Sequence, residues 1–240
     1  YILNRATARE IEVIKAALTR RERDSRRPVS SSNIRGMAHD LAGSVAGQLE
    51  SIGDVKEMTL RYVREMVRKA VPEMPAEQQR AVARAVGIGA VKYADLSQNP
   101  QSAVTFTWEK ALAMDGNSAP YLQYAYARIA SVIDKHAERF PDCDWRKEPI
   151  VLDAPQARRL AVRLARFGDA VFEAAEQEKP SLLADALYDL SQAYSSFYQN
   201  VPFLKADPGI RESRVRLCDL VAQILRRGLA LLGIDTPDRI

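Results

Sequence analysis

Apolar residues recur along most of the chain at intervals of three and four, which is the period of an α-helix with one buried face. The clearest stripe is Leu183, Leu187, Leu190, Tyr194 and Phe197, which predicts the core face of a single helix. No internal repeat or parallel-sheet pattern interrupts this period. The pattern therefore predicts an all-α fold, with helices over residues 7–17, 34–52, 58–71, 76–86, 107–114, 120–137 and 212–232, and further helices beginning after Asp153 and at Pro180.

Breaker and capping residues set the expected helix boundaries. Gly87 is expected to end the helix before it, and residues 89–99 to form a short strand or helical turn followed by a loop. Asp153 and Gln156 have the spacing of a capping pair at the start of a helix. Gly168, between a phenylalanine and an aspartate, is expected to separate two helices. The whole is then a helical bundle preceded by helical connecting elements.

Charge and composition permit several classes of partner without choosing one. The 240 residues are 47% hydrophobic and long enough to bury a sizeable core. A net charge of +4 and an isoelectric point of about 9.1 permit a nucleic-acid partner but do not require one. The chain has nine tyrosines against two tryptophans. Tyrosine rings stack on unpaired bases, and they also brace one helix against another, so both interpretations stay open.

Metal sites and membrane spans are not indicated by the sequence. Cys143 and Cys218 lie far apart, and His39 and His136 are equally isolated, so we expect no metal site. We expect reduced thiols in a cytoplasmic protein, although two cysteines also allow one disulfide. No apolar run is long enough to span a bilayer, and no signal-peptide pattern is present.

Three blocks carry a specific resemblance. Residues 87–128 read GIGAVKYADLSQNPQSAVTFTWEKALAMDGNSAPYLQYAYAR, and residues 183–200 read LADALYDLSQAYSSFYQN. The last block, residues 215–240, ends in LGIDTPDRI. In this order the blocks resemble the C-terminal part of the class I arginyl-tRNA synthetases, and the resemblance covers roughly residues 59–240. Ile240 departs from the family pattern, which usually ends in Met.

The resemblance implies a DALR-type anticodon-binding bundle over residues 106–240. Residues 59–105 resemble the helical connector that joins the catalytic domain to the bundle in this family, and residues 1–58 are a helical segment of unknown role that the resemblance does not cover. The implied partner is tRNA(Arg), through its anticodon stem-loop, with no DNA and no membrane. ATP and Mg would serve the full-length enzyme, because this chain has neither a His-Ile-Gly-His type nor a Lys-Met-Ser-Lys-Ser type element. We therefore expect no catalytic residue and no cofactor in this chain, and no arginylation by it alone.

The resemblance leaves two kinds of protein open. Because the chain begins at Tyr1 rather than Met, we expect either a piece of a synthetase or a free-standing relative of its bundle. A catalytic synthetase domain, in cis or in trans, would then be a second partner. The alternative is a non-catalytic paralogue that acts as a regulatory or scaffolding protein through the same helical groove.

The expected tRNA contacts centre on one helix. Tyr121, Tyr124 and Arg128 are spaced three and then four residues apart, so we expect them to share a face. By resemblance they match the anticodon-facing positions of the family. The remaining candidates are Gln123 for amide contacts, Tyr198 and the terminal Arg239 and Ile240 beside the groove, and Lys92 for a phosphate contact. The alternative for the tyrosines is helix bracing, and for Lys92 it is domain packing.

Overall fold

The computed structural model describes residues 60–61, 63–69, 72–99 and 106–240. The helices expected over residues 7–17 and 34–52 lie outside the described residues, as do His39 and the unmatched segment 1–58. Within the described part of the chain every regular element is helical and no strand occurs. The all-α prediction is therefore confirmed. No helix among these residues is long and apolar enough to cross a membrane.

The helices are joined by connections of different lengths. Residues 60–61 and 63–69 are helical, in agreement with the helix expected over residues 58–71. The elements that follow are α3 (Ala76–Leu96), α4 (Trp108–Ala111), α5 (Ala119–Arg139), α6 (Pro155–Glu176), α7 (Pro180–Asn200) and α8 (Ile210–Leu231), and residues 140–154 link α5 to α6. Prolines open α6 and α7 and stand in the first turn of α5, where a missing amide hydrogen leaves no bond unmade.

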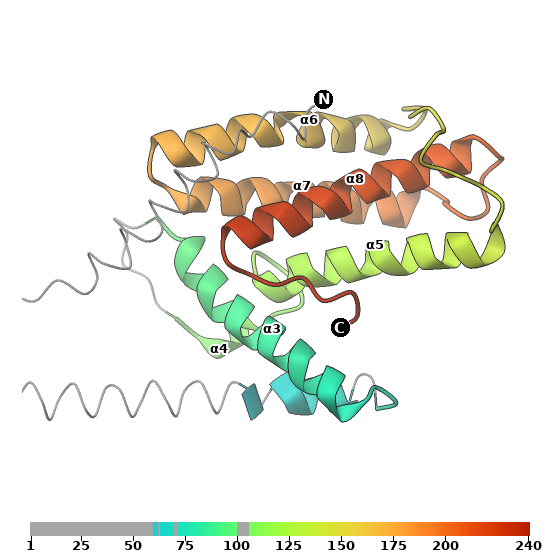
Figure 1. Ribbon diagram of the computed structural model, residues 1–240. Coiled ribbons are helices and arrows are strands. Elements are labelled where there is room, and N and C mark those ends of the chain that lie inside the picture. Colours follow the sequence, from blue (N-terminus) through green and yellow to red (C-terminus); the bar gives the residue numbers. More distant parts are fainter. Residues whose placement is uncertain (1–59, 62, 70–71, 100–105) are drawn as a thin grey trace, which may run out of the picture.

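Figure 1 shows α5, α6, α7 and α8 lying side by side, with α3 crossing obliquely near one end of α5. The predicted stripe on α7 is the centre of this bundle, and its members are almost completely buried: Leu183, Leu187, Leu190, Tyr194 and Phe197. A second, smaller core lies under α3 and joins it to α4 and to Val63 and Val67. The bundle is thus held by apolar burial on the faces that the helical period predicted.

Helix α3 does not end at Gly87, contrary to the expectation from sequence. It continues through both glycines to Leu96, so the strand or loop expected at residues 89–99 is wrong for most of that stretch. Gly89 serves packing here, because a Cβ at this position would lie 3.0 Å from both Nε2 of Gln123 and Cγ2 of Ile234. The longer helix carries Tyr93 into the main core.

Two further boundary predictions fail. Helix α6 runs unbroken through Gly168, because a helical glycine is tolerated where packing holds the helix on both sides. Asp153 and Gln156 form no capping pair, since the N-cap of α6 is Ala154 without a side-chain bond. Asp153 instead accepts a hydrogen bond from Arg214 of α8 at 2.5 Å.

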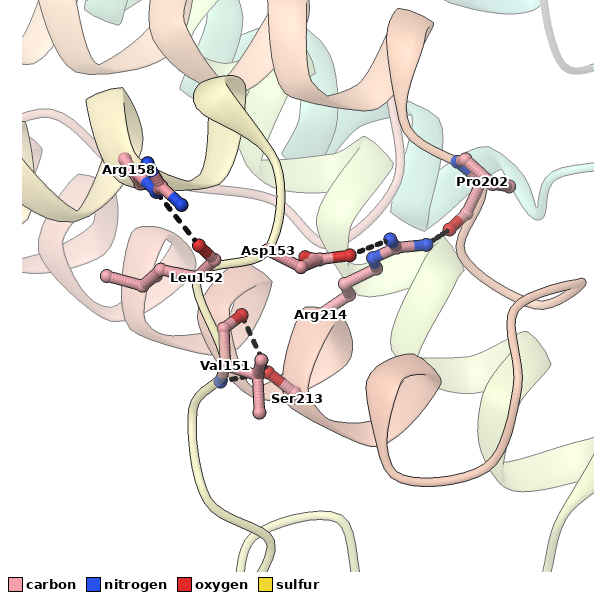
Figure 2. Close-up of polar contacts among 7 residues, drawn as sticks. All are labelled: Val151, Leu152, Asp153, Arg158, Pro202, Ser213 and Arg214. Carbon is pink, nitrogen blue, oxygen red and sulfur yellow. Dashed lines mark hydrogen bonds and ion pairs between the residues drawn. The ribbon is translucent and has the colours of Figure 1, made fainter.

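Figure 2 shows how the connector between α5 and α6 is fastened to the start of α8. The guanidinium of Arg214 bridges Asp153 and the carbonyl oxygen of Pro202, which lies 2.7 Å away. Next to it, Ser213 accepts from the amide of Val151 at 2.7 Å and donates to the carbonyl of the same residue at 3.3 Å. Ser213 thus satisfies both backbone groups of Val151, and Arg214 links the same connector to Pro202, which lies between α7 and α8.

Two helical glycines allow a test of this packing. Gly228 of α8 meets the core side chain Leu187, because an added Cβ would lie 2.4 Å from Cδ2 of that leucine. We expect Gly228→Ala to lower the free energy of unfolding by about 1–3 kcal/mol, since overpacking outweighs the gain in helix propensity. A Cβ added at Gly168 would meet open space, so Gly168→Ala is the matched control. It should raise the free energy of unfolding by about 0.5–1 kcal/mol. Urea unfolding measures both, and an equal change in the two variants would contradict the packing.

Candidate nucleic-acid interface

The first turn of α5 sets which side chains face outward. Ser118 caps this helix: its hydroxyl accepts from the amide of Tyr121 at 3.3 Å and donates to the carbonyl of Ala113 at 2.6 Å. From this start, Leu122 and Ile129 point into the main core. The opposite side of α5 is then left for solvent, and it carries Tyr124, Arg128 and the residues one and two turns further on.

A groove of about 820 Å³ lies along this outer side of α5. Its walls come from α5, from the end of α7, from the last three residues of the chain and from Glu73 ahead of α3. The lining residues are Glu73, Tyr124, Ala127, Arg128, Ser131, Asp134, Lys135, Glu138, Tyr198, Gln199, Asp238, Arg239 and Ile240. Five of the sequence-predicted residues therefore meet there, from three separate segments: Tyr124 and Arg128 of α5, Tyr198 of α7, and the terminal Arg239 and Ile240.

Arg128 lies between two tyrosine rings in this groove. Its guanidinium carbon is 4.5 Å from the ring centre of Tyr124 and 4.9 Å from that of Tyr198. Both distances are those of cation–π contacts, which hold the flat guanidinium against the rings. Tyr124 remains 38% exposed and Tyr198 37% exposed, so each ring still offers apolar surface to a ligand. Phe203, with its ring centre 5.7 Å from that of Tyr198, supports the second ring from behind.

The charge of the groove is mixed. Its lining includes the acidic residues Glu73, Asp134, Glu138 and Asp238 and the basic residues Arg128, Lys135 and Arg239. A surface that binds nucleic acid mainly through phosphates would carry a clear excess of positive charge. Here the acidic groups offset the basic ones, so ring surfaces and individual hydrogen bonds have to supply most of any binding free energy.

Tyr121 does not line the groove, although its spacing suggested a shared face. Its hydroxyl lies 3.1 Å from the hydroxyl of Ser195 on α7, and its ring meets Tyr188 edge-on with 5.8 Å between ring centres. A step of three residues turns a helix about 60° short of a full circle, and on that side of α5 the neighbouring α7 occupies the space. Tyr121 thus has the bracing role that the sequence left open.

Gln123 and Lys92 are also engaged within the protein. Gln123 is 0% exposed, and its Nε2 donates to the carbonyl oxygens of Ala85 and Asp235. That burial leaves it no surface for RNA, contrary to the expected amide contact. Lys92 donates from Nζ to the carbonyl of Gly233 at 2.5 Å, where α8 has just ended. This contact matches the packing alternative, and a phosphate contact by the exposed Lys92 stays a prediction.

The terminal residues reach the groove as expected. Arg239 and Ile240 both line it, and Ile240 also packs against the second core, under α3. Sequence reasoning missed Ser131, Lys135 and Glu138, which follow Arg128 at helical spacings and could have been found by extending the same face. Glu73 and Asp238 carried no such signal, because only the folded chain brings them to this place.

Asn117, the turn residue before α5, accepts a hydrogen bond from the hydroxyl of Tyr93 at 2.6 Å. The same hydroxyl lies 3.0 Å from the carbonyl oxygen of Ala184 on α7. Burial and the nearby Asp185 raise the pKa of Tyr93 well above its usual value, so the phenol remains a neutral donor. The turn is thereby tied to both α3 and α7, and it places the start of α5.

The structure brings together three ligand-type side chains that the sequence separates. Atoms of His136, Cys143 and Glu212 lie within 4.8 Å of one another, so the expectation that the histidines and cysteines stay isolated is wrong for His136 and Cys143. Glu212 is already bonded, because Nε of Arg211 donates to one oxygen at 2.6 Å and the amide of Gly209 to the other at 2.5 Å. Burial and the Glu212 carboxylate raise the pKa of the Cys143 thiol, so in the metal-free protein it stays a neutral thiol. Through the Gly209 amide, Glu212 forms a polar cap on α8.

Comparison with known proteins shows which proteins this chain resembles. Residues 122–240 match the DALR anticodon binding domain family. The chain is 43% identical over 176 residues to an arginine–tRNA ligase of Proteus mirabilis and 46% identical over 176 residues to one of Azotobacter vinelandii. Each alignment covers 73% of this chain and 30% of the relative, so the chain spans about a third of the length of the curated relatives it matches.

Solved structures agree with the sequence comparison. Arginyl-tRNA synthetase of Thermus thermophilus superposes with a TM-score of 0.72 at 32% identity, covering 79% of this chain and 32% of that one. The enzyme of Plasmodium falciparum gives a TM-score of 0.66 at 21% identity over 80% of this chain and 33% of that one, which supports the fold alone.

The polar cap on α8 generates a pH prediction. Burial raises the pKa of Glu212, but hydrogen bonds from its own amide, the Gly209 amide and Arg211 lower it by more. The net effect is a pKa of about 2, below the ordinary value of 4.5. A depressed pKa stabilises the fold above pH 4.5, and this contribution is lost as the pH falls toward 2. Between pH 7 and pH 3, we expect the native chain to lose about 1–3 kcal/mol more unfolding free energy than Glu212→Gln.

Urea unfolding at the two pH values measures this difference. Glu176→Gln, at the exposed end of α6, is the matched carboxylate control and should lose as much as the native chain. An acid loss in Glu212→Gln equal to that of the native chain would contradict the role given to this carboxylate.

Proposed function

We propose that this chain, which carries the DALR anticodon binding domain of the arginine–tRNA ligases over residues 122–240, binds the anticodon stem-loop of tRNA(Arg) in the groove along α5. The observation that supports this most directly is the pair of half-exposed rings, Tyr124 and Tyr198, with the guanidinium of Arg128 held between them. The names of the relatives supply the class of RNA, and the groove supplies the chemistry of contact.

Anticodon bases suit this surface because they are unpaired. A single-stranded base can leave the stack of its neighbours and expose both its flat face and its hydrogen-bonding edge. The exposed rings of Tyr124 and Tyr198 each offer a platform for such a face. Arg128 lies within reach of either platform, and its planar set of donors can bond to base acceptors or to a phosphate oxygen.

The mixed charge of the groove fits recognition of bases more than attraction to the backbone. Lys135 and Arg239 are the other basic residues of the lining, and they are the natural candidates for phosphate contacts. Four acidic side chains in the same groove would weaken binding of a generic polyanion. Discrimination between RNAs would therefore come from stacking and edge contacts at the loop.

The proposed role is recognition, as one part of arginylation. The chain spans about 30% of the length of the arginine–tRNA ligases it matches. We place the joining of arginine to tRNA, with its ATP and Mg, in a catalytic synthetase domain acting in cis or in trans. Within the described residues we assign no catalytic side chain.

Truncating the exposed ring of Tyr124 tests the platform. We expect Tyr124→Ala to weaken binding of the tRNA(Arg) anticodon stem-loop by roughly tenfold to a hundredfold, because one stacked base contributes about 1–3 kcal/mol. Fluorescence anisotropy with a labelled stem-loop measures the affinity, and thermal unfolding checks the fold. The matched control is Phe172→Ala, which removes another exposed ring (53% exposed) from α6, outside the groove lining.

Two outcomes would count against the assignment. Loss of the fold in Tyr124→Ala would make this ring structural. Equal, weak affinity of the native chain for tRNA(Arg) and for a transcript with an altered anticodon would favour the scaffolding alternative.

Arg128→Lys separates the shape of this side chain from its charge. Lysine keeps the positive charge but not the planar donor set that contacts both rings. We expect roughly a tenfold loss of stem-loop affinity, with the slope of affinity against salt concentration unchanged because the charge is kept. Arg159→Lys, on the exposed side of α6, is the control and should leave the affinity as it is. A normal affinity in Arg128→Lys would show that only charge matters there.

A further inference from the structure

The last residues of the chain form one wall of the groove without belonging to any helix. After α8 the backbone turns at Gly233, where φ is 69°, and residues 234–240 pass α5 and α3. Asp238, Arg239 and Ile240 then line the groove together with Tyr124 and Arg128. A segment without regular backbone hydrogen bonds needs other contacts to keep one position.

Gln123 supplies such a contact from inside the protein. Its side-chain nitrogen donates to the carbonyl oxygen of Asp235 at 2.7 Å and to that of Ala85 at 3.1 Å. A single amide thus joins three segments: α5, which carries it, α3 and the terminal segment of residues 233–240. Gln123 itself is fully buried, so removing its amide takes away a donor that lies inside the protein.

The surroundings of Gln123 are shaped to admit this amide. Gly89 of α3 leaves the space, since a Cβ there would lie 3.0 Å from Nε2 of Gln123 and 3.0 Å from Cγ2 of Ile234. Ile234 is itself buried at 2% exposure and belongs to the main core. Because α3, the Gln123 amide and Ile234 pack closely together, the backbone at the neighbouring Asp235 has little freedom to move.

Two further contacts act nearer the surface. Lys92 donates to the carbonyl of Gly233, two residues before Asp235. The hydroxyl of Tyr126 donates to Oδ1 of Asp238 at 2.9 Å, three residues after Asp235. The Gln123 bond lies between them in sequence, and Gln123, at 0% exposure, is the most buried of the three donor residues. It therefore decides where the backbone leaves the core and enters the groove.

We propose that Gln123 is a positioning residue, which holds residues 235–240 where Asp238, Arg239 and Ile240 complete the groove. It acts on RNA through this segment and touches no nucleotide itself. Its effect on RNA rests on the proposed function, whereas its effect on the segment does not. The two can therefore be tested separately.

The first experiment measures the motion of the terminal segment in the 240-residue chain without RNA. Gln123→Met keeps the length and bulk of the side chain but cannot donate a hydrogen bond. Backbone order parameters from ¹⁵N relaxation should fall from about 0.85 to below about 0.6 over residues 235–240, while those of α5 stay high. Val171→Ala, a buried truncation on α6, is the control that lowers stability without touching this segment.

A second variant disturbs the contact between Gln123 and the terminal segment from α3. Gly89→Ala leaves Gln123 in place but pushes its amide and Ile234 apart, so the same amides should lose order. If Gln123→Met does not fold, Gly89→Ala alone decides. A rigid terminal segment in a folded variant overturns the proposal, and so does an equal loss of order in Val171→Ala.

The second experiment measures stem-loop affinity in a double-mutant cycle. We expect Gln123→Met to weaken binding about tenfold in the native background and less than twofold in a 240-residue chain that carries Asp238→Ala, Arg239→Ala and Ile240→Ala, because the second chain has no groove-lining side chains left to position. An equal loss of affinity in both chains would show that Gln123 does not act through residues 235–240. If the native chain binds no stem-loop, the proposed function fails, and the relaxation measurements still decide the role of Gln123.

Discussion

Burial of one side of α5 is the constraint on which the rest of this structure depends. Leu122 and Ile129 are completely buried against the bundle, and α3, α7 and α8 all pack on this helix. Because a helix is rigid, fixing these side chains inward also fixes Tyr124 and Arg128 outward, at the groove. The free energy that stabilises the fold is thus the same free energy that orients the candidate binding surface.

The groove combines weak charge with well-placed rings. Arg128 is restrained by two tyrosines before any ligand arrives, so less side-chain freedom would be lost on binding. Acidic and basic side chains nearly balance along the lining, which limits attraction to nucleic acid in general. Such a surface suits discrimination among loops of similar charge, and it explains why the modest net charge of the chain was uninformative.

Buried polar groups hold the irregular parts of the molecule. Arg214 and Ser213 fasten the connector before α6, Glu212 caps α8, and Gln123 fastens the terminal segment. Each of these side chains satisfies a backbone group that no helix supplies with a partner. The loops and the terminal segment are therefore placed by particular hydrogen bonds, whereas the helices are placed by apolar packing.

The sequence by itself determined the all-α class, the inward stripe on α7 and the outward position of Tyr124 and Arg128, because helical period and apolar burial act locally. It misjudged Gly87 and Gly168, since a glycine ends a helix only where no neighbour supports the next turn.

Only the tertiary structure decided the remaining matters. It turned Tyr121 toward α7, enclosed Gln123, and brought Glu73 and Asp238 to the groove. Each of these depends on which segment, distant in sequence, lies across from a given side chain. A local pattern carries no record of that neighbour, so contacts between distant segments had to be read from the folded chain.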